Sequence, residues 1–313
     1  MSYSFVQQAS AYSAGASSLT AGTFTPNAGD LLPIAFFMNP TADLLNISIS
    51  DGGAGNNYVS PGIISTNNTS IPITFSAPPT GTSQGLNANF TGASGTYLIV
   101  FSDGELRIGT LANGASTCSW AGGTSNLFAG ALTGSPTVNA TAYSTSSGQI
   151  LVNLYAQNAA GVSTTIALAD SSGNHLEGLY VGDYSGIATS GAYLGGASGF
   201  LNIPSVIGAN EITTGNVSGV TQPSLLWGFC RNQAADGTPL AGTSPTSFTG
   251  RGNVWVATSA QAEDATVSSN VAVTFGTNSS SQYGTFYSGA MAFNLAATQV
   301  PFMNYSMPPM MAQ

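Results

Sequence analysis

Residues 149–186 read QILVNLYAQNAAGVSTTIALADSSGNHLEGLYVGDYSG, and this stretch decides the fold class. It holds three short apolar runs, at Ile150–Ala156, Thr164–Ala169 and Leu176–Tyr184, separated by clusters of Gly, Asn, Asp and Ser. Short runs rich in β-branched and aromatic side chains, with such clusters between them, are typical of antiparallel strands. The stretch therefore predicts the central meander of a β-sandwich, against which the rest of the chain packs.

The composition limits the classes of function. The chain has 313 residues, of which 42% are hydrophobic and 5% are charged, whereas about a quarter of an ordinary soluble domain is charged. Its 3 basic residues are all arginines and its net charge is −9, so it has no basic surface to hold phosphates. This argues against binding to nucleic acid or to anionic membranes. We expect an exterior of uncharged hydroxyl and amide side chains.

The amino terminus and the cysteines indicate the compartment. The opening, MSYSFVQQAS, lacks the basic and apolar regions of a secretory signal, and no apolar run approaches the ~20 residues that cross a bilayer. The cysteines, Cys118 and Cys230, are too few for a disulfide framework, so both are predicted to be buried thiols. A neutral exterior without an export signal fits a virion component that is made in the host cytoplasm and released by lysis.

Further strands are predicted on both sides of the opening stretch. Residues 31–38 (LLPIAFFM) and 223–230 (PSLLWGFC) are apolar almost throughout, which is typical of strands buried on both faces. Because Pro33 removes a ladder donor, we expect its strand near an edge or a bulge. Residues 45–50 (LNISIS) alternate, as a half-buried strand does. No helical period persists anywhere, so the sequence predicts an all-β chain.

A hairpin is predicted around Asp103-Gly104, because this pair favours the type I′ turn that joins two strands directly. A two-residue loop places Phe101 opposite Leu106 and Ile99 opposite Ile108, which makes one face of the hairpin apolar. The other face then carries more polar side chains. The sequence therefore predicts a small β-meander module with one buried face.

The three tryptophans are the candidate contacts for a ligand or partner. A turn at Asn113-Gly114 returns the chain so that Trp120 lies near Arg107, which predicts a cation–π stack on the surface. Trp227 and Trp255 lie in apolar runs and are expected in the core. Trp120 is expected to be exposed, and with Arg107 it is the candidate for stacking on a sugar ring or a partner.

Residues suited to catalysis are sparse. The only histidine, His175, follows a Gly-Asn turn and is expected to be exposed; a Ser-His-Asp triad or a histidine-ligated metal would have to use it. Glu263 and Asp264 are neighbours on a predicted strand, so they point to opposite faces and cannot flank one glycosidic bond. The loop 51–57 lacks the oxygen spacing of a calcium loop. We predict no catalytic residue, no metal, no cofactor and no enzymatic activity.

The carboxyl-terminal segment, residues 298–313, is too apolar for a solvated tail and too rich in proline for a helix. It contains Met303, Met307 and Met310, whose flexible side chains adapt to irregular apolar surfaces. We predict that it is an extended tail that lies against a neighbouring protomer, with these methionines as contacts.

Several motifs carry a resemblance to a known type of module. They are a D-x-x-G-N-x-Y type turn at 51–58, a Y-A-x-N-x-A-G strand at 155–161 and an E-Y-S-G type strand at 183–186. Together they resemble a β-sandwich module that recurs in structural and tail-fibre proteins of tailed bacteriophages. An F-S-D-G-x-x-R hairpin at 101–107 resembles a separate small module associated with phages.

The resemblance implies a jelly-roll-like antiparallel β-sandwich formed by residues 1–62 and 145–297. The small β-meander domain, residues 63–144, is then inserted between two early strands, and 298–313 forms the tail. The virion context implies a non-enzymatic structural protein, a tail, fibre or neck component that assembles with itself and with other virion proteins. The alternatives are a tip that binds a host receptor or glycan through the inserted domain, a capsid decoration protein, and a polysaccharide depolymerase, which the few carboxylates disfavour.

Overall fold

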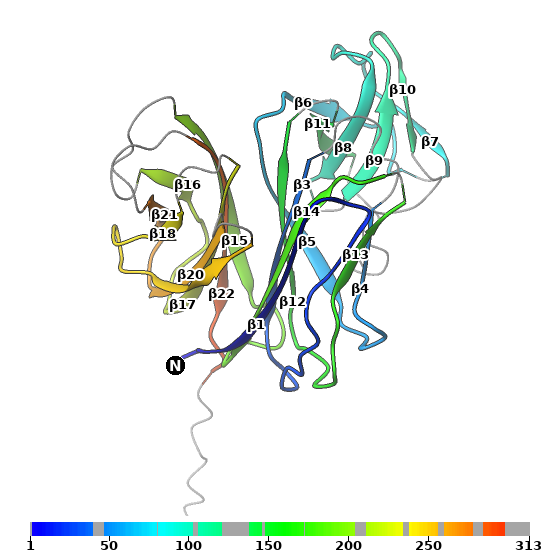
Figure 1. Ribbon diagram of the computed structural model, residues 1–313. Helices are drawn as coiled ribbons and strands as arrows, with labels where there is room; N and C mark the ends of the chain where they lie inside the picture. Colours follow the sequence, from blue (N-terminus) through cyan, green and yellow to red (C-terminus); the bar gives the residue numbers. More distant parts are fainter. Residues whose placement is uncertain are drawn as a thin grey trace, which may run out of the picture.

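The structure is a computed structural model in which every regular element of the described residues is a β-strand (Figure 1). The described part forms 22 strands in five sheets and contains no helix, hence none that could cross a membrane. The all-β sandwich architecture predicted from the sequence is confirmed. The described residues are 2–39, 47–79, 81–102, 106–120, 138–145, 148–171, 173–203, 211–233, 238–255, 260–277 and 284–297.

The central sheet lies in the middle of the molecule and forms one wall of two separate cores (Figure 1). Across it the strands are β1 (Ser4–Ala16), β14 (Leu176–Ser185), β3 (Leu32–Met38), β12 (Ile150–Ala156) and β5 (Tyr58–Thr66). Ile34 and Phe36 point into one core and Ala35 and Phe37 into the other, as the two-residue period of a strand requires. Because both faces are covered, β3 is buried at every position, as its apolar run predicted.

One face of the central sheet is covered by two sheets. The cover sheet consists of β2 (Ser18–Thr20), β13 (Ala167–Asp170) and β4 (Ile47–Ser50). The inserted sheet consists of β6 (Ser70–Thr74), β11 (Asn139–Ser144), β8 (Gly95–Phe101), β9 (Leu106–Leu111), β10 (Thr117–Trp120) and β7 (Ser83–Gly85). Leu98 and Ile108 of the inserted sheet join the core beneath the central sheet, while Ile99 and Phe101 belong to a separate core within the inserted domain.

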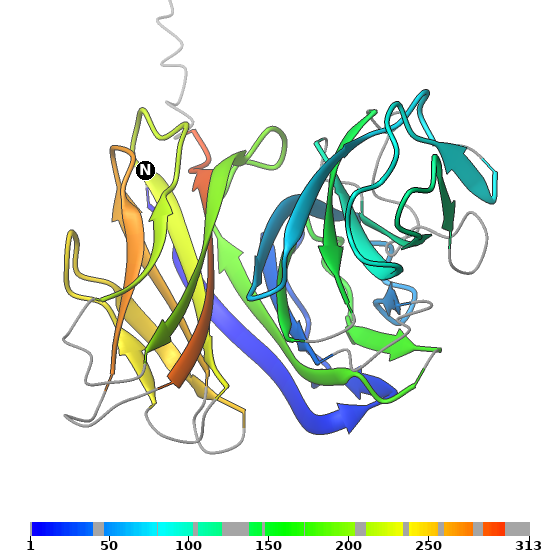
Figure 2. The same ribbon diagram turned by 90° about the horizontal axis from the view of Figure 1, so that it is seen from above.

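The other face of the central sheet packs against the C-terminal sheet. This sheet consists of β15 (Tyr193–Ile203), β22 (Gly284–Asn294), β17 (Ser224–Asn232), β20 (Ala260–Val267) and β19 (Thr249–Val254). The outer sheet, β16 (Ile212–Asn216), β21 (Ala272–Thr277) and β18 (Pro239–Ala241), covers its far side. Gly289 leaves the space that the amide of Asn153 fills across the interface. Seen from above, these two sheets form one lobe and the other three form the second (Figure 2).

The prediction of a central meander is wrong. A meander would pair β13 with both β12 and β14. Instead β12 and β14 both pair with β3, while β13 lies in the cover sheet between β2 and β4. The reason is burial: β12 and β14 are almost fully buried and need cover on both faces, whereas β13 alternates between buried and partly or fully exposed positions. A strand with one apolar face belongs in an outer layer.

The expectation for Pro33 is also wrong in part. Its strand is the middle one of the central sheet rather than an edge. The β3–β14 ladder, however, is interrupted beside this proline: Ile34 pairs with Val181, and the next pairing is the isolated bridge between Leu31 and Tyr184. The missing N–H is therefore accommodated by a gap in a central ladder.

The hairpin register in the inserted domain differs from the prediction by one residue. Val100 pairs with Leu106 and Ile99 pairs with Arg107, whereas the two-residue loop required Ile99 opposite Ile108; the turn residues 103–105 lie outside the described part. All but one of the β8 residues are buried, because its two faces enter two cores. Both sets of alternate side chains are apolar, so the hydrophobic pattern fits either register.

The pairing of β5 with β12 shows where the inserted domain begins. β5 continues through Thr66 and pairs with β12, Ile150 opposite Thr66 and Ala156 opposite Tyr58. The inserted sheet is therefore drawn from residues 70–144, and the sequence boundary at 62/63 falls inside β5.

Candidate functional site

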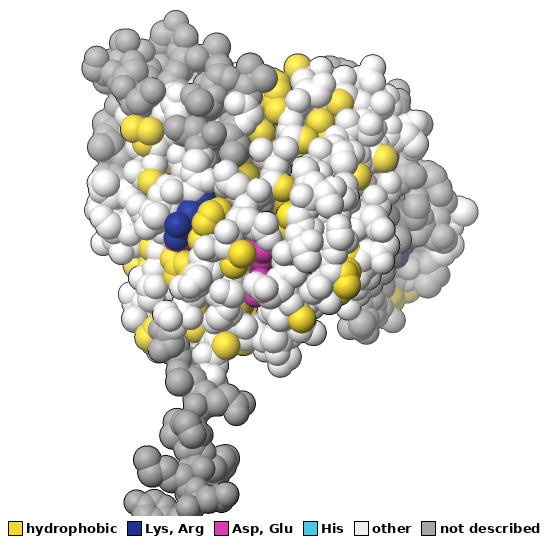
Figure 3. Space-filling view, turned by 60° about the horizontal axis from the view of Figure 1, so that its bottom comes forward, with side chains coloured by type: hydrophobic (Ala, Val, Ile, Leu, Met, Phe, Trp, Pro, Cys, Tyr) yellow, Lys and Arg dark blue, Asp and Glu magenta, His cyan; other side chains and the backbone are white. Residues whose placement is uncertain are grey.

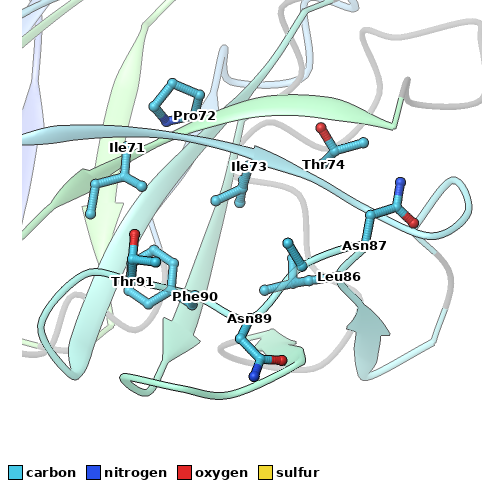
Figure 4. A pocket seen from close by; sticks show the side chains of 10 residues that line it. Ile71, Pro72, Ile73, Thr74, Leu86, Asn87, Asn89, Phe90 and Thr91 are labelled. Carbon is cyan, nitrogen blue, oxygen red and sulfur yellow. The ribbon is translucent and has the colours of Figure 1, made fainter.

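A groove on the inserted domain is a candidate binding site (Figure 4). It has a volume of about 300 Å³ and lies between residues 71–74 of β6 and the segment 86–91. Ile71, Ile73 and Phe90 supply apolar walls. The amides of Asn87 and Asn89 are exposed, and Figure 4 shows them pointing away from the neighbouring apolar side chains. The groove therefore has an apolar floor and an amide-rich rim.

Backbone hydrogen bonds fix the segment that forms one wall of the groove. The amide of Asn87 donates to the carbonyl of Thr74 at 2.9 Å. Phe90 donates to Ala115 and accepts from Gly114, each at 2.8 Å, and this ties the segment to the β9–β10 turn. The groove is thus formed before any ligand arrives, which lowers the entropic cost of binding.

The groove residues carry no ionisable side chain. Its polar groups are two amides and the hydroxyls of Thr74 and Thr91, which donate and accept hydrogen bonds without selecting a charge. Such a lining suits a neutral ligand with hydroxyl or acetamido groups beside an apolar face, as in a saccharide.

The predicted contact between Arg107 and Trp120 exists, but it is not on the surface. The guanidinium carbon lies 5.2 Å from the Trp120 ring centroid and 5.9 Å from that of Phe101. Arg107 is 7% exposed and Trp120 5% exposed, so the expectation of an exposed tryptophan is wrong. The ring of Phe75 packs against Trp120 at a tilt within the same core. The pair stabilises the inserted domain from within and cannot meet a ligand without unfolding it.

The other predicted positions are also accounted for. Trp227 is completely buried, as expected, and both cysteines are buried free thiols. Trp255 is half-buried and donates its indole N–H to the carbonyl of Leu179. Met303, Met307 and Met310 lie outside the described residues.

His175 is not the exposed turn residue that the sequence predicted. Its Nδ1 lies 2.6 Å from Oδ2 of Asp170, and its side chain is only 11% exposed. The turn folds the imidazole back over Gly173 towards the end of β13. No serine hydroxyl among the described residues bonds to the ring, so the pair lacks the nucleophile of a triad. Within the described part, no three His, Cys, Asp or Glu side chains converge on a possible metal position.

Asp264 is the centre of a polar cluster between the central and C-terminal sheets. Arg251 donates to both of its carboxylate oxygens, one bond being 2.7 Å. The hydroxyls of Tyr3 and Tyr184 donate to it at 2.5 and 2.8 Å. The guanidinium also lies 4.8 Å from the Phe5 ring centroid. A fully buried carboxylate is stabilised here by a bidentate ion pair.

Glu263 points the opposite way, as predicted. Its Oε2 accepts the backbone N–H of Gly242 at 2.8 Å on the side of the outer sheet. The side chain is completely buried, and burial raises its pKa well above the ordinary glutamate value. The two neighbouring carboxyl groups therefore cannot act on one substrate.

Arg231 occupies an aromatic box between the same two sheets. Its guanidinium carbon lies 5.4 to 5.9 Å from the ring centroids of Phe37, Trp255 and Tyr12. A nitrogen of the guanidinium lies 3.9 Å from Glu177. Burial raises the pKa of Glu177, and the arginine opposes that shift. Each of the three arginines of the chain thus stacks on aromatic rings.

A pair of carboxyl groups that sequence reasoning missed lies at one end of the central sheet. Asp183 is completely buried and Asp30 nearly so, and the two carboxyl groups are close enough to interact electrostatically. The Gln7 amide donates to Asp183 at 2.8 Å, while Asn27 donates twice to Asp30 at 3.0 Å. Burial first, and then Asp30, raise the pKa of Asp183 to about 7, against the effect of Gln7. The sequence signal that could have revealed this pair is Asp183 itself, an acidic residue within an apolar strand.

The described surface carries almost no charge. Of eight acidic residues in the described ranges only Glu211 is exposed; the buried ones are Asp30, Asp51, Asp170, Glu177, Asp183, Glu263 and Asp264. Figure 3 shows one face on which uncharged atoms dominate and the coloured charged patches are small. The ionic groups therefore act mainly inside the fold.

Comparison of the chain with protein-family models, with curated proteins and with solved structures finds no match.

Proposed function

We propose that the chain is a non-enzymatic structural protein of a phage virion, a tail, fibre or neck component that assembles as a homo-oligomer. The observation that carries the proposal is the placement of charge. A general acid or base must reach its substrate, whereas seven of the eight described carboxyl groups are buried. Of these, Asp264, Glu263 and Glu177 link neighbouring sheets, which supports a mechanical role. The phage-type motifs of the sequence support the virion context.

The test is to measure the mass of the purified protein in solution and its abundance in purified particles. The proposal expects a defined multimer and many copies in each particle. A protein that stays monomeric across the concentrations of an infected cell, and that is missing from the particles, would contradict it. A reducing-end assay with host polysaccharide should stay at background; sugar release would favour a depolymerase.

A second candidate, a glycan-binding tip, is favoured by the neutral groove. The paired substitution Asn87→Ala and Asn89→Ala removes the amide rim without touching a core. The substitution should weaken adsorption to host cells if the groove binds the receptor, and Asn202→Ala, which removes an exposed amide from β15, is the matched control. Unchanged adsorption of the paired variant would leave the structural role as the better explanation.

A further inference from the structure

The outermost strand of the central sheet, β1, has one unoccupied side. It is 13 residues long and pairs with β14. On its other side no described strand lies within hydrogen-bonding distance, and none of its outward backbone groups bonds to another described backbone group. A row of such donors and acceptors is a template for a further strand.

β1 lacks charge and proline, two of the features that usually protect an edge, although its ladder with β14 shifts register between Phe5 and Gln7 and between Tyr12 and Ala16. Its sequence, SFVQQASAYSAGA, contains no charged residue and no proline, and Val6 is 42% exposed. The opposite edge of the sheet, β5, is interrupted by Pro61 and by an irregular register. Proteins normally blunt exposed edges with charges, prolines or bulges. Residues 7–12 of β1, between its two register shifts, are thus a regular stretch of edge that is open to strand addition.

The last described residues of the chain lie near the amino-terminal end of β1. The amide of Ala296 donates to the carbonyl of Gly186 at 2.8 Å, and Gly186 lies against Ser2 and Tyr3. The end of β22 and the amino terminus lie at the same end of the molecule (Figure 1). The last described residues therefore lie close to the start of β1.

The tail sequence contains one segment suited to a strand. Residues 302–307 (FMNYSM) lie between Pro301 and Pro308 and have about the usual length of a strand, 5–6 residues. Two methionines and the tyrosine alternate with the other three side chains, so they would share one face of a strand. The core margin at β1 consists of partly buried Ala9 and Ala11, whose small side chains leave room for long flexible ones.

We propose that residues 302–307 of a neighbouring copy add to β1 as an antiparallel strand and link the protomers. Every strand pairing in the described part is antiparallel. A tail that starts at the Ser4 end would run parallel to its own β1, so the antiparallel partner comes from another copy. This inference rests on the proposed homo-oligomer and assigns its contact.

Disulfide trapping between single-cysteine variants tests the contact. One full-length copy carries Ser306→Cys in the tail, and a second, tagged copy carries Ser4→Cys, Ser10→Cys or Ser13→Cys at an exposed position of β1. Each copy has one new cysteine, so a mixed disulfide joins two chains. Cys118 and Cys230 are buried and do not compete. Ser198→Cys, on the edge strand β15, is the matched control.

The inference expects mixed dimers with β1 cysteines, a yield that depends on position along the strand, and none with the control. Truncation after Ala297 should lower the oligomer mass. Three results would overturn the inference: disulfides between two β1 cysteines, an intrachain disulfide in a chain carrying both changes, and a truncated protein of unchanged multiplicity. The last leaves the homo-oligomer intact, whereas a full-length monomer would remove both proposals.

Discussion

Replacing Asp183 by Asn should raise the stability of the protein at alkaline pH and leave it nearly unchanged in acid. The asparagine has the same shape, and its side-chain oxygen can still accept the Gln7 amide. The wild-type carboxyl is buried beside Asp30, so the native state is most stable when this carboxyl is protonated. The variant removes the need to keep that proton.

The size and sign of this stability difference follow from the pKa of Asp183, which rises from 3.8 to about 7 on folding. Between these values the native state binds more protons than the unfolded state, so the free energy of unfolding of the wild type falls as pH rises. Three pKa units correspond to a ceiling of roughly 4 kcal/mol. The advantage of Asp183→Asn should therefore grow from about pH 4 to about pH 7 and then level off.

Urea unfolding followed by tryptophan fluorescence across this pH range measures the difference. Glu211→Gln is the control, because Glu211 is exposed and should follow the wild type. A stability difference between Asp183→Asn and wild type that is independent of pH, or that grows as pH falls, would refute the reasoning.

Three further changes test other buried groups. Glu263→Gln should also stabilise the protein increasingly as pH rises, because burial raises the pKa of this carboxyl; a flat pH series would contradict this. Arg251→Met leaves the carboxylate of Asp264 buried without its cation and should cost about 3–5 kcal/mol in urea unfolding; a loss below about 1 kcal/mol would show that water replaces the arginine. Gly109→Ala places a methyl 2.6 Å from the sulfur of Cys118 and should lower stability by about 1–3 kcal/mol. Adding Cys118→Ala should recover part of that loss in thermal unfolding, and additive losses would exclude the clash.

The sequence predicted where the strands lie better than it predicted which strands pair with each other. Nearly continuous apolar runs located β3, β12 and β17, because strands covered on both faces need apolar side chains on both. The same property makes the pairing hard to predict. A strand such as β8 has no polar face, so its hydrophobic pattern cannot fix its register with β9. For this reason the predicted register of the β8–β9 hairpin differs from the observed one by one residue.

The candidate site was predicted less well. The closeness of Arg107 and Trp120 followed from turn chemistry, but their burial depends on Phe75 and other side chains of the same domain that no local pattern links to them. The groove depends on the segment 86–91, an irregular stretch held by backbone bonds that carry no sequence signature. The Asp30–Asp183 pair joins distant parts of the chain, which spacing alone cannot reveal.

Because its ion pairs lie inside, the described exterior has few charges for dissolved salt to screen. Screening acts on exposed charges over ~8–10 Å at moderate ionic strength and much less on buried pairs. Added salt should thus alter both the folding equilibrium and contacts made through this exterior only slightly.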